Sequence, residues 1–155
     1  MKRFNFSLQK VLELREYGEE EARIELGRAI GVLNEIQSKI NSNAALMAHA
    51  ENERFSGIAS TGGIVGGAGS MFAWDGYIMR LKHETERLLV EAANAQVVVE
   101  EKRELYIEAS RRLKVMEKLR EKREGEYRRE MFAAQTRELD DLWRPKDKDK
   151  ERSAG

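Results

Sequence analysis

Apolar side chains recur along residues 8–50 at alternating steps of four and three, the spacing that places them along one side of a coiled-coil helix. Of thirteen consecutive positions in this phase, ten are apolar, and Arg15, Glu19 and Asn43 are the exceptions. The phase runs through Leu8, Leu12, Arg15, Glu19, Ala22, Leu26, Ala29, Leu33, Ile36, Ile40, Asn43, Met47 and Ala50. A strand would require alternation with period two, which this segment lacks. The pattern predicts a first helix over about residues 7–55.

A second phase occupies the other half of the chain, and twelve of its sixteen positions are apolar or aromatic. It runs through Trp74, Ile78, Leu81, Thr85, Leu88, Ala92, Ala95, Val99, Lys102, Tyr106, Ala109, Leu113, Met116, Arg120, Arg123 and Tyr127. The polar exceptions gather after Met116, so the seam should weaken there. Pro145 cannot continue a helix and disfavours helical geometry in the residue before it. These features predict a second helix over about residues 73–142, ending near Leu142 to Arg144.

Six glycines lie between the two helical segments, at positions 57, 62, 63, 66, 67 and 69. Glycine loses more backbone entropy on ordering than any other residue, so this density predicts a break at a tip over about residues 56–72. Two helices joined by a short turn fold back on each other to bury their apolar stripes. The sequence therefore predicts an all-α fold, a single long two-helix antiparallel coiled-coil hairpin over residues 1–144 with a glycine-rich tip. Residues 145–155 should form a charged disordered tail.

The turn also predicts which residues face one another. In an antiparallel pair of helices, the residue numbers of contacting pairs add to a constant. With the midpoint of the turn near residue 64, that sum should be roughly 128. Leu12 would then lie near Met116, and Leu46 near Leu81 or Lys82. Because the second arm is longer, residues beyond about 120 should have no opposing helix.

Composition supports a thin coiled coil rather than a thick core. Charged residues make up 36% of the chain and aromatics 7%. The 28 basic and 28 acidic side chains cancel, which removes the basic excess expected of a nucleic-acid-binding protein. The chain has no cysteine, and no apolar run approaches the roughly 18 residues of a membrane span. The N-terminus does not have the form of a secretory signal, so a cytoplasmic protein is expected.

Candidate catalytic and metal-binding motifs are weak. Gly62 and Gly67 have the glycine spacing of a phosphate-binding loop, but Ala68 follows where that loop needs lysine. His49 and His83 flank the tip, where a metal would also need nearby glutamates, and no His-Glu-x-x-His motif accompanies them. A two-helix hairpin also offers little concave surface for an active site. We therefore expect no enzyme activity, cofactor or metal.

Two segments stand out as candidate contact surfaces. Residues 111–129 contain nine basic and four acidic side chains, which indicates either an ordinary solvated face or a docking face for an acidic protein or nucleic acid. Met71, Phe72, Trp74, Tyr77, Ile78 and Met79 form the most apolar cluster of the chain. This cluster exceeds what one seam can bury, and it is either core at the tip or an anchor surface for a partner.

The N-terminal sequence Phe4-Asn5-Phe6-Ser7-Leu8-Gln9-Lys10-Val11-Leu12-Glu13-Leu14-Arg15 resembles the start of FliJ proteins, the small coiled-coil component of the flagellar type III export apparatus. Gly57-Ile58-Ala59-Ser60 and the aromatic entry to the second helix strengthen the resemblance, which covers about residues 4–144. It implies a non-enzymatic stalk that links the ring of the export ATPase FliI to the export gate protein FlhA and binds export chaperones. The expected location is the cytoplasmic face of the inner membrane beneath the flagellar basal body, with peripheral association to the membrane-embedded gate and without nucleic acid.

The resemblance also assigns the two ends. Tyr77 and Leu81 best match the family's gate-facing surface, and the aromatic cluster adds Trp74 and Ile78. The ATPase would bind the end formed by the N-terminus and the overhang of the second helix, where Phe4, Phe6, Arg120, Arg123 and Arg128 are the candidate residues. Three other classes remain open at this point: an unrelated cytoplasmic coiled-coil scaffold, a hairpin that binds nucleic acid with strong salt dependence and, most remotely, a hydrolase.

Overall fold

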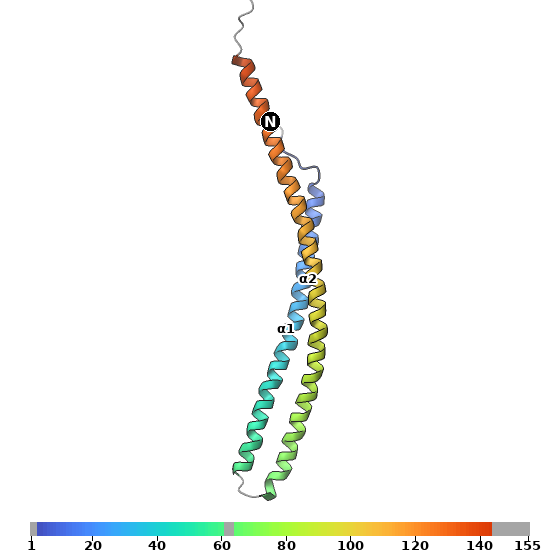
Figure 1. Ribbon diagram of the computed structural model, residues 1–155, viewed down its shortest axis with the longest axis vertical. Helices are drawn as coiled ribbons and strands as arrows, with labels where there is room; N and C mark the ends of the chain where they lie inside the picture. The colour runs from blue at the N-terminus through green and yellow to red at the C-terminus, as the bar shows by residue number, and fades with distance from the viewer. Residues whose placement is uncertain (1–2, 61–63, 144–155) are drawn as a thin grey trace, which may run out of the picture. The chain divides into compact units, whose positions relative to one another are not determined.

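The computed structural model describes residues 3–60 and 64–143, and its architecture is two long helices (Figure 1). Helix α1 spans Gln9–Ser60, with 52 residues, and α2 spans Ile64–Trp143, with 80 residues. Leu, Ala, Glu, Lys and Arg dominate both helices, and these residues have favourable helix propensities. The prediction of an all-α fold made of two long helices is confirmed.

The helices extend further into the glycine-rich segment than the sequence indicated. The predicted tip covered residues 56–72, whereas α1 continues to Ser60 and α2 already begins at Ile64. Each glycine costs only about 1 kcal/mol relative to alanine in a helix, and adding residues to an existing helix is far easier than starting one. Residues 61–63 of the predicted tip and the predicted tail at 145–155 lie outside the described residues.

The chain divides into two compact units, which we describe separately. Unit 1 contains residues 1–18 and 110–155, and unit 2 contains residues 19–109. Each unit therefore combines part of α1 with part of α2.

In unit 2 the two helices run antiparallel and side by side (Figure 1). Side chains from the two predicted heptad phases form the contact: the most buried are Ala29, Ala50, Ile78, Leu81, Leu88 and Val99, with the polar Asn43 among them. All the other members of these phases within the unit are at least partly buried. The predicted periodicity therefore identifies the residues of this seam correctly.

Polar contacts connect α1 to α2 across unit 2. Glu25 Oε2 lies 3.6 Å from Lys102 Nζ, and Arg54 Nε lies 3.0 Å from Asp75 Oδ1. Between these ion pairs, the Asn43 side-chain amide donates to the Thr85 hydroxyl over 3.5 Å. All three pairs lie within one residue of the predicted register, which is thereby confirmed for this unit.

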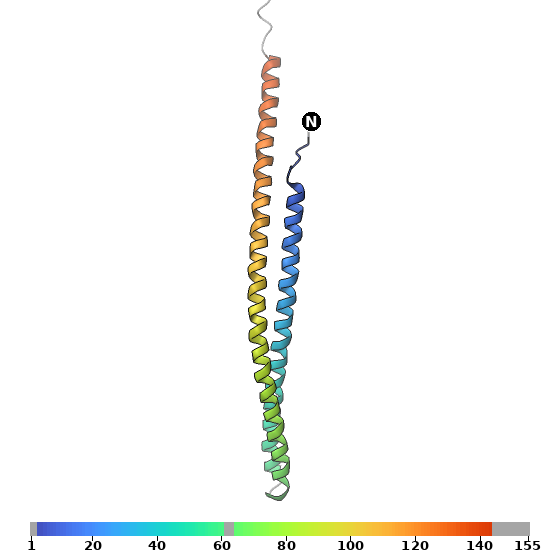
Figure 2. The ribbon, with the colours of Figure 1, turned by 90° about the vertical axis from the view of Figure 1, so that its right-hand side faces the viewer.

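In unit 1 a short non-helical segment, residues 3–8, leads into α1 and lies along α2. The backbone N–H of Gln9 donates to the carbonyl of Phe6, and that of Leu12 donates to Leu8, which starts the helix. Phe6 and Leu12 are buried. The prediction that α2 has no opposing helix beyond about residue 120 holds for helices, but the non-helical segment covers α2 as far as Tyr127. Past that point no other described segment of the unit accompanies α2 (Figure 2).

Candidate docking surfaces

The N-terminal segment is held to α2 by aromatic and cationic contacts. The rings of Phe4 and Tyr127 lie 5.6 Å apart at an angle of 46°. The Arg123 guanidinium lies 5.8 Å from the centre of the Phe6 ring and donates a hydrogen bond to the Ser7 hydroxyl over 2.9 Å. A cation over an aromatic ring contributes roughly 0.5–1 kcal/mol at a partly exposed site. Phe4, Phe6 and Arg123, three of the predicted ATPase-side residues, are therefore brought together by folding.

The predicted basic face of α2 carries less unpaired charge than its sequence suggests. Arg120 helps to line a shallow hollow of unit 1 whose other walls are Leu12 and four glutamates, at positions 16, 117, 121 and 124. The Arg128 guanidinium donates to Glu124 over 2.6 Å, one helical turn away. Arg123 is engaged by the N-terminal segment. Local carboxylates thus offset much of the positive charge, because residues four apart on a helix are neighbours.

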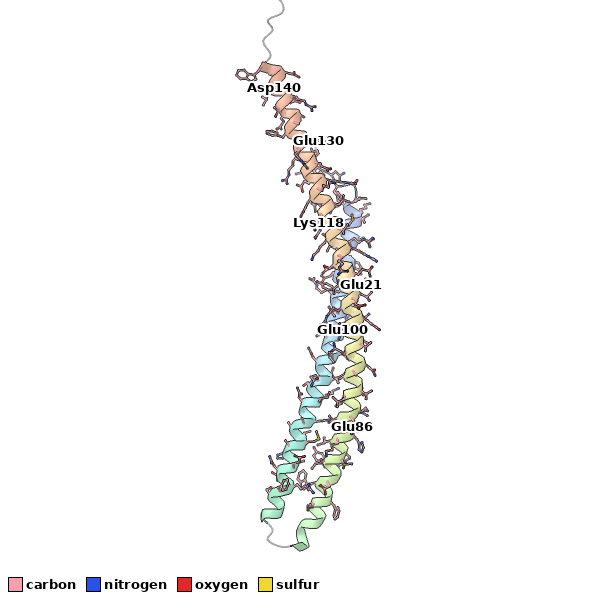
Figure 3. The ribbon with its side chains drawn as sticks, viewed as in Figure 1. Glu21, Glu86, Glu100, Lys118, Glu130 and Asp140 are labelled. Atoms are coloured by element: carbon pink, nitrogen blue, oxygen red, sulfur yellow. The ribbon has the colours of Figure 1, made fainter. Side chains whose placement is uncertain are left out.

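An apolar surface that the sequence analysis did not single out lies on the extension of α2. Its side chains are strongly exposed, with Phe132 at 72% and Trp143 at 83% of their full accessibility, and Leu139 and Leu142 lie between them. Figure 3 labels Glu130 and Asp140 on this part of the helix. In the sequence, the spacing of seven residues between Phe132 and Leu139 could have indicated that both lie on one face of the helix. We call these four residues the extension face.

The predicted gate-side residues divide into buried and accessible ones. Ile78 and Leu81 are buried in the seam of unit 2, so they help to hold the hairpin together. Trp74 and Tyr77 are half-buried and contact each other edge to face, with ring centres 6.1 Å apart. The Arg80 guanidinium covers the Tyr77 ring at 5.8 Å.

Two further members of the apolar cluster, Phe72 and Met79, are exposed, Phe72 at 76%. The cluster is therefore partly buried in the seam and partly exposed. On the facing helix, Leu46 is exposed and Ala50 is buried.

Metal and membrane features are limited in the described part of the chain. Within residues 3–60 and 64–143, no three His, Asp or Glu side chains are arranged to hold a metal ion. His83 faces Glu86 at 3.6 Å on the outer side of α2. Neither α1 nor α2, as described, contains a stretch long and apolar enough to cross a bilayer.

These features define a coiled-coil protein whose candidate sites are exposed helix surfaces, described separately in each unit. A comparison with protein families matches the flagellar FliJ protein over residues 4–144. The chain belongs to this family, and it is accordingly a component of the flagellar export apparatus. No significant match was found among curated proteins or solved structures.

Proposed function

We propose that this chain is a non-enzymatic stalk of flagellar protein export, which links the export ATPase ring to the export gate and also binds export chaperones. The location that follows is the cytoplasmic face of the inner membrane beneath the basal body. Family membership supports this role. The observation that carries the proposal is the asymmetry of unit 1, in which α2 outruns the N-terminal segment and exposes the extension face.

The extension face and the neighbouring arginines are the proposed ATPase contact. A lone amphipathic helix with exposed aromatic and aliphatic side chains has the form of a segment that inserts into a partner's cavity. Phe4 and Phe6 serve this contact by fixing the N-terminal segment against α2, and Arg128 lies on its rim, 75% exposed. Rim charges mainly affect the association rate, whereas buried aromatic anchors carry most of the affinity.

The proposed gate contact lies at the start of α2. Trp74 and Tyr77 keep part of their rings accessible, and Phe72 and Met79 extend the same apolar cluster. Trp and Tyr are common anchors of protein interfaces, since they bury a large area with few rotatable bonds. Ile78 and Leu81 contribute indirectly, because their burial in the seam holds this part of α2 against α1.

The test measures the affinity of the full chain for an export ATPase and for the cytoplasmic domain of the gate protein. The ATPase-side variant combines Phe132→Ala, Leu139→Ala and Arg128→Glu, and it should lose ATPase binding only. The gate-side variant combines Phe72→Ala, Trp74→Ala and Tyr77→Ala, and it should lose gate binding only. Leu81 and Arg123 are left unchanged because both also stabilise the fold.

Leu14→Ala is the matched control, since Leu14 is exposed and outside both proposed contacts. It should bind both partners like the unaltered chain. Circular dichroism on each variant verifies that the helices persist. Equal loss of both partners in each variant, or loss in neither, would show that the two contacts are not separate.

A further inference from the structure

The composition of α2 changes near residue 130 in unit 1. Of the fourteen residues 117–130, eleven are charged, whereas only four of the thirteen residues 131–143 are charged. The extension face lies within the second stretch, between Phe132 and Trp143. Covering apolar side chains is favourable, whereas covering charged ones gives little gain because water must be removed from them. A partner that binds α2 therefore gains most of its affinity from residues 131–143.

The side of α2 that carries the N-terminal segment remains apolar beyond the end of that segment. Phe4 packs on Tyr127, with ring centres 5.6 Å apart. Met131 and Ala134 follow Tyr127 by four and seven residues, and both steps return to the same side of a helix. The extension face lies roughly a third of a turn further around α2. Apolar residues thus occupy two adjoining sides of α2 after residue 130, and a partner that covers both sides meets the N-terminal segment.

The N-terminal segment is attached both to α2 and to α1. Phe6 is only 5% exposed. The Arg123 guanidinium lies 5.8 Å from the centre of the Phe6 ring and donates to the Ser7 hydroxyl over 2.9 Å. The Phe6 carbonyl accepts from the backbone N–H of Gln9, which joins the segment to the first turn of α1. The segment therefore occupies a defined place on α2, next to the stretch that a partner would cover.

We propose that the N-terminal segment is a stop that sets how far a partner encloses α2. The partner surrounds residues 131–143 and halts against Phe4; Figure 3 labels Glu130, which directly precedes the enclosed stretch. At 1.5 Å per residue, the enclosed length is about 20 Å. The partner that fits is a socket for a single helix, with an apolar lining and a polar rim beside Arg128. This inference rests on the proposed contact between α2 and the export ATPase, and it adds the depth of that contact.

Charge alone would not fix this depth. Arg128 donates to Glu124 over 2.6 Å within α2, and such paired charges can be covered by a hydrated interface at small cost. Without the N-terminal segment, the next obstacle is α1 itself, whose Leu12 shares a hollow with Arg120. A partner could then advance from Tyr127 to the neighbourhood of Arg120, a distance of about 10 Å. The segment therefore decides between two depths that can be distinguished by experiment.

Cysteine footprinting measures the depth, since the chain has no cysteine of its own. Lys114, Glu121 and Gln135 are exposed and are separated by multiples of seven residues, so they lie along one side of α2. The N-terminal segment contacts a different side, at Arg123 and Tyr127. Each of the three positions is changed to cysteine in turn, and the rate of maleimide modification is compared with and without a saturating export ATPase. In the otherwise unaltered chain, Gln135→Cys should react several-fold more slowly in the complex, whereas Glu121→Cys and Lys114→Cys should react as they do alone.

The stop is removed by combining Phe4→Ser with Phe6→Ser, which leaves α2 unchanged. In this background Glu121→Cys should become protected as well, whereas Lys114→Cys lies behind the start of α1 and should still react freely. Asn5→Ser, at an exposed position of the same segment, is the matched control and should leave the footprint as it is in the unaltered chain. Circular dichroism verifies that both helices persist in each variant.

Arg123→Ala releases the N-terminal segment without altering it and should extend the footprint in the same way. Protection of Glu121→Cys in the unaltered chain would show that the segment does not halt the partner. Protection of Gln135→Cys alone in every background would show that another feature sets the depth. Either result overturns the proposal. Free reaction of Gln135→Cys in every background would show that the partner does not enclose α2, and it would overturn the proposed ATPase contact together with the stop.

Discussion

Two leucines near the start of α1 show how strongly position on the helix decides the environment of a side chain. Leu12 is 1% exposed and Leu14 is 65% exposed, although only one residue separates them. Successive residues on a helix are rotated by about 100°, so a step of two carries a side chain from the seam to solvent. The heptad phase identified Leu12 as a seam residue from the sequence alone.

Leu12→Ala should destabilise the protein by about 2–4 kcal/mol, because it leaves a cavity in a narrow seam. Leu14→Ala should change stability by less than about 0.5 kcal/mol, as is usual at the surface. Urea unfolding followed by circular dichroism measures both. Similar losses of unfolding free energy in the two variants would mean that burial does not determine how much each leucine contributes to stability.

The N-terminal segment depended on contacts that sequence periodicity could not reveal. Phe4 and Phe6 were predicted as binding residues from the family resemblance, but their packing on Tyr127 and Arg123 lies outside any heptad pattern. The apparent basic excess of α2 was likewise an incomplete guide, because a count of charges along α2 could not show that Glu16 of α1 also lies beside Arg120.

Arg123→Ala should release the N-terminal segment, since it removes both the Ser7 hydrogen bond and the contact with Phe6. Amide hydrogen exchange of residues 3–8 should accelerate several-fold, as expected for a segment held by few contacts. Arg128→Ala, an equivalent change that affects only a contact within α2, is the control. Unchanged exchange in the Arg123 variant would show that other contacts hold the segment.

At the scale of the elements, periodicity predicted both helices and the residues of their seam. It failed at the glycine-rich segment, where α1 and α2 extend beyond their expected ends. The failure has a physical reason: propensity differences are small per residue, and the energy of extending a helix already formed outweighs them. After Met116 the seam departs from its predicted phase, and Leu119 rather than Arg120 becomes the partly buried residue.

Glycines within α1 offer a test of how much low helix propensity costs inside an established helix. Gly27 and Gly31 are exposed, and a Cβ at either position would meet open space. Gly27→Ala and Gly31→Ala should each raise stability by about 0.5–1 kcal/mol, since alanine has less backbone entropy to lose. Thermal unfolding should show additive increases in melting temperature. A decrease in either variant would indicate that the glycine serves a close approach by a partner.

At the scale of the whole chain, the sequence predicted the class and the family but only part of each candidate surface. Ile78 and Leu81 were assigned to the gate contact, yet they are buried in unit 2, because one heptad position cannot serve the seam and the exterior together. The extension face was not recognised, since exposed apolar residues on a helix become visible only once the seam residues are known.

The gate-side assignment predicts different effects for buried and accessible residues. Leu81→Ala should lower the melting temperature and weaken gate binding together, because it opens the seam. Tyr77→Ala should weaken gate binding with a small change in melting temperature. Binding and melting temperature measured on both variants distinguish a residue that stabilises the seam from one that contacts the gate protein directly. A Leu81 variant that melts normally but fails to bind would assign that leucine to the contact itself.

The hydrogen bond between Asn43 and Thr85 has a consequence for how the chain finds its fold. A heptad seam is nearly degenerate under sliding, since a shift of seven residues again aligns apolar with apolar. Such a frameshift would move Asn43 opposite Ile78 or Ala92, neither of which can bond its amide. A buried amide without a partner costs about 1–3 kcal/mol, so one asparagine penalises every slipped alignment of unit 2. The buried asparagine of the seam thus distinguishes the native pairing from slipped alignments.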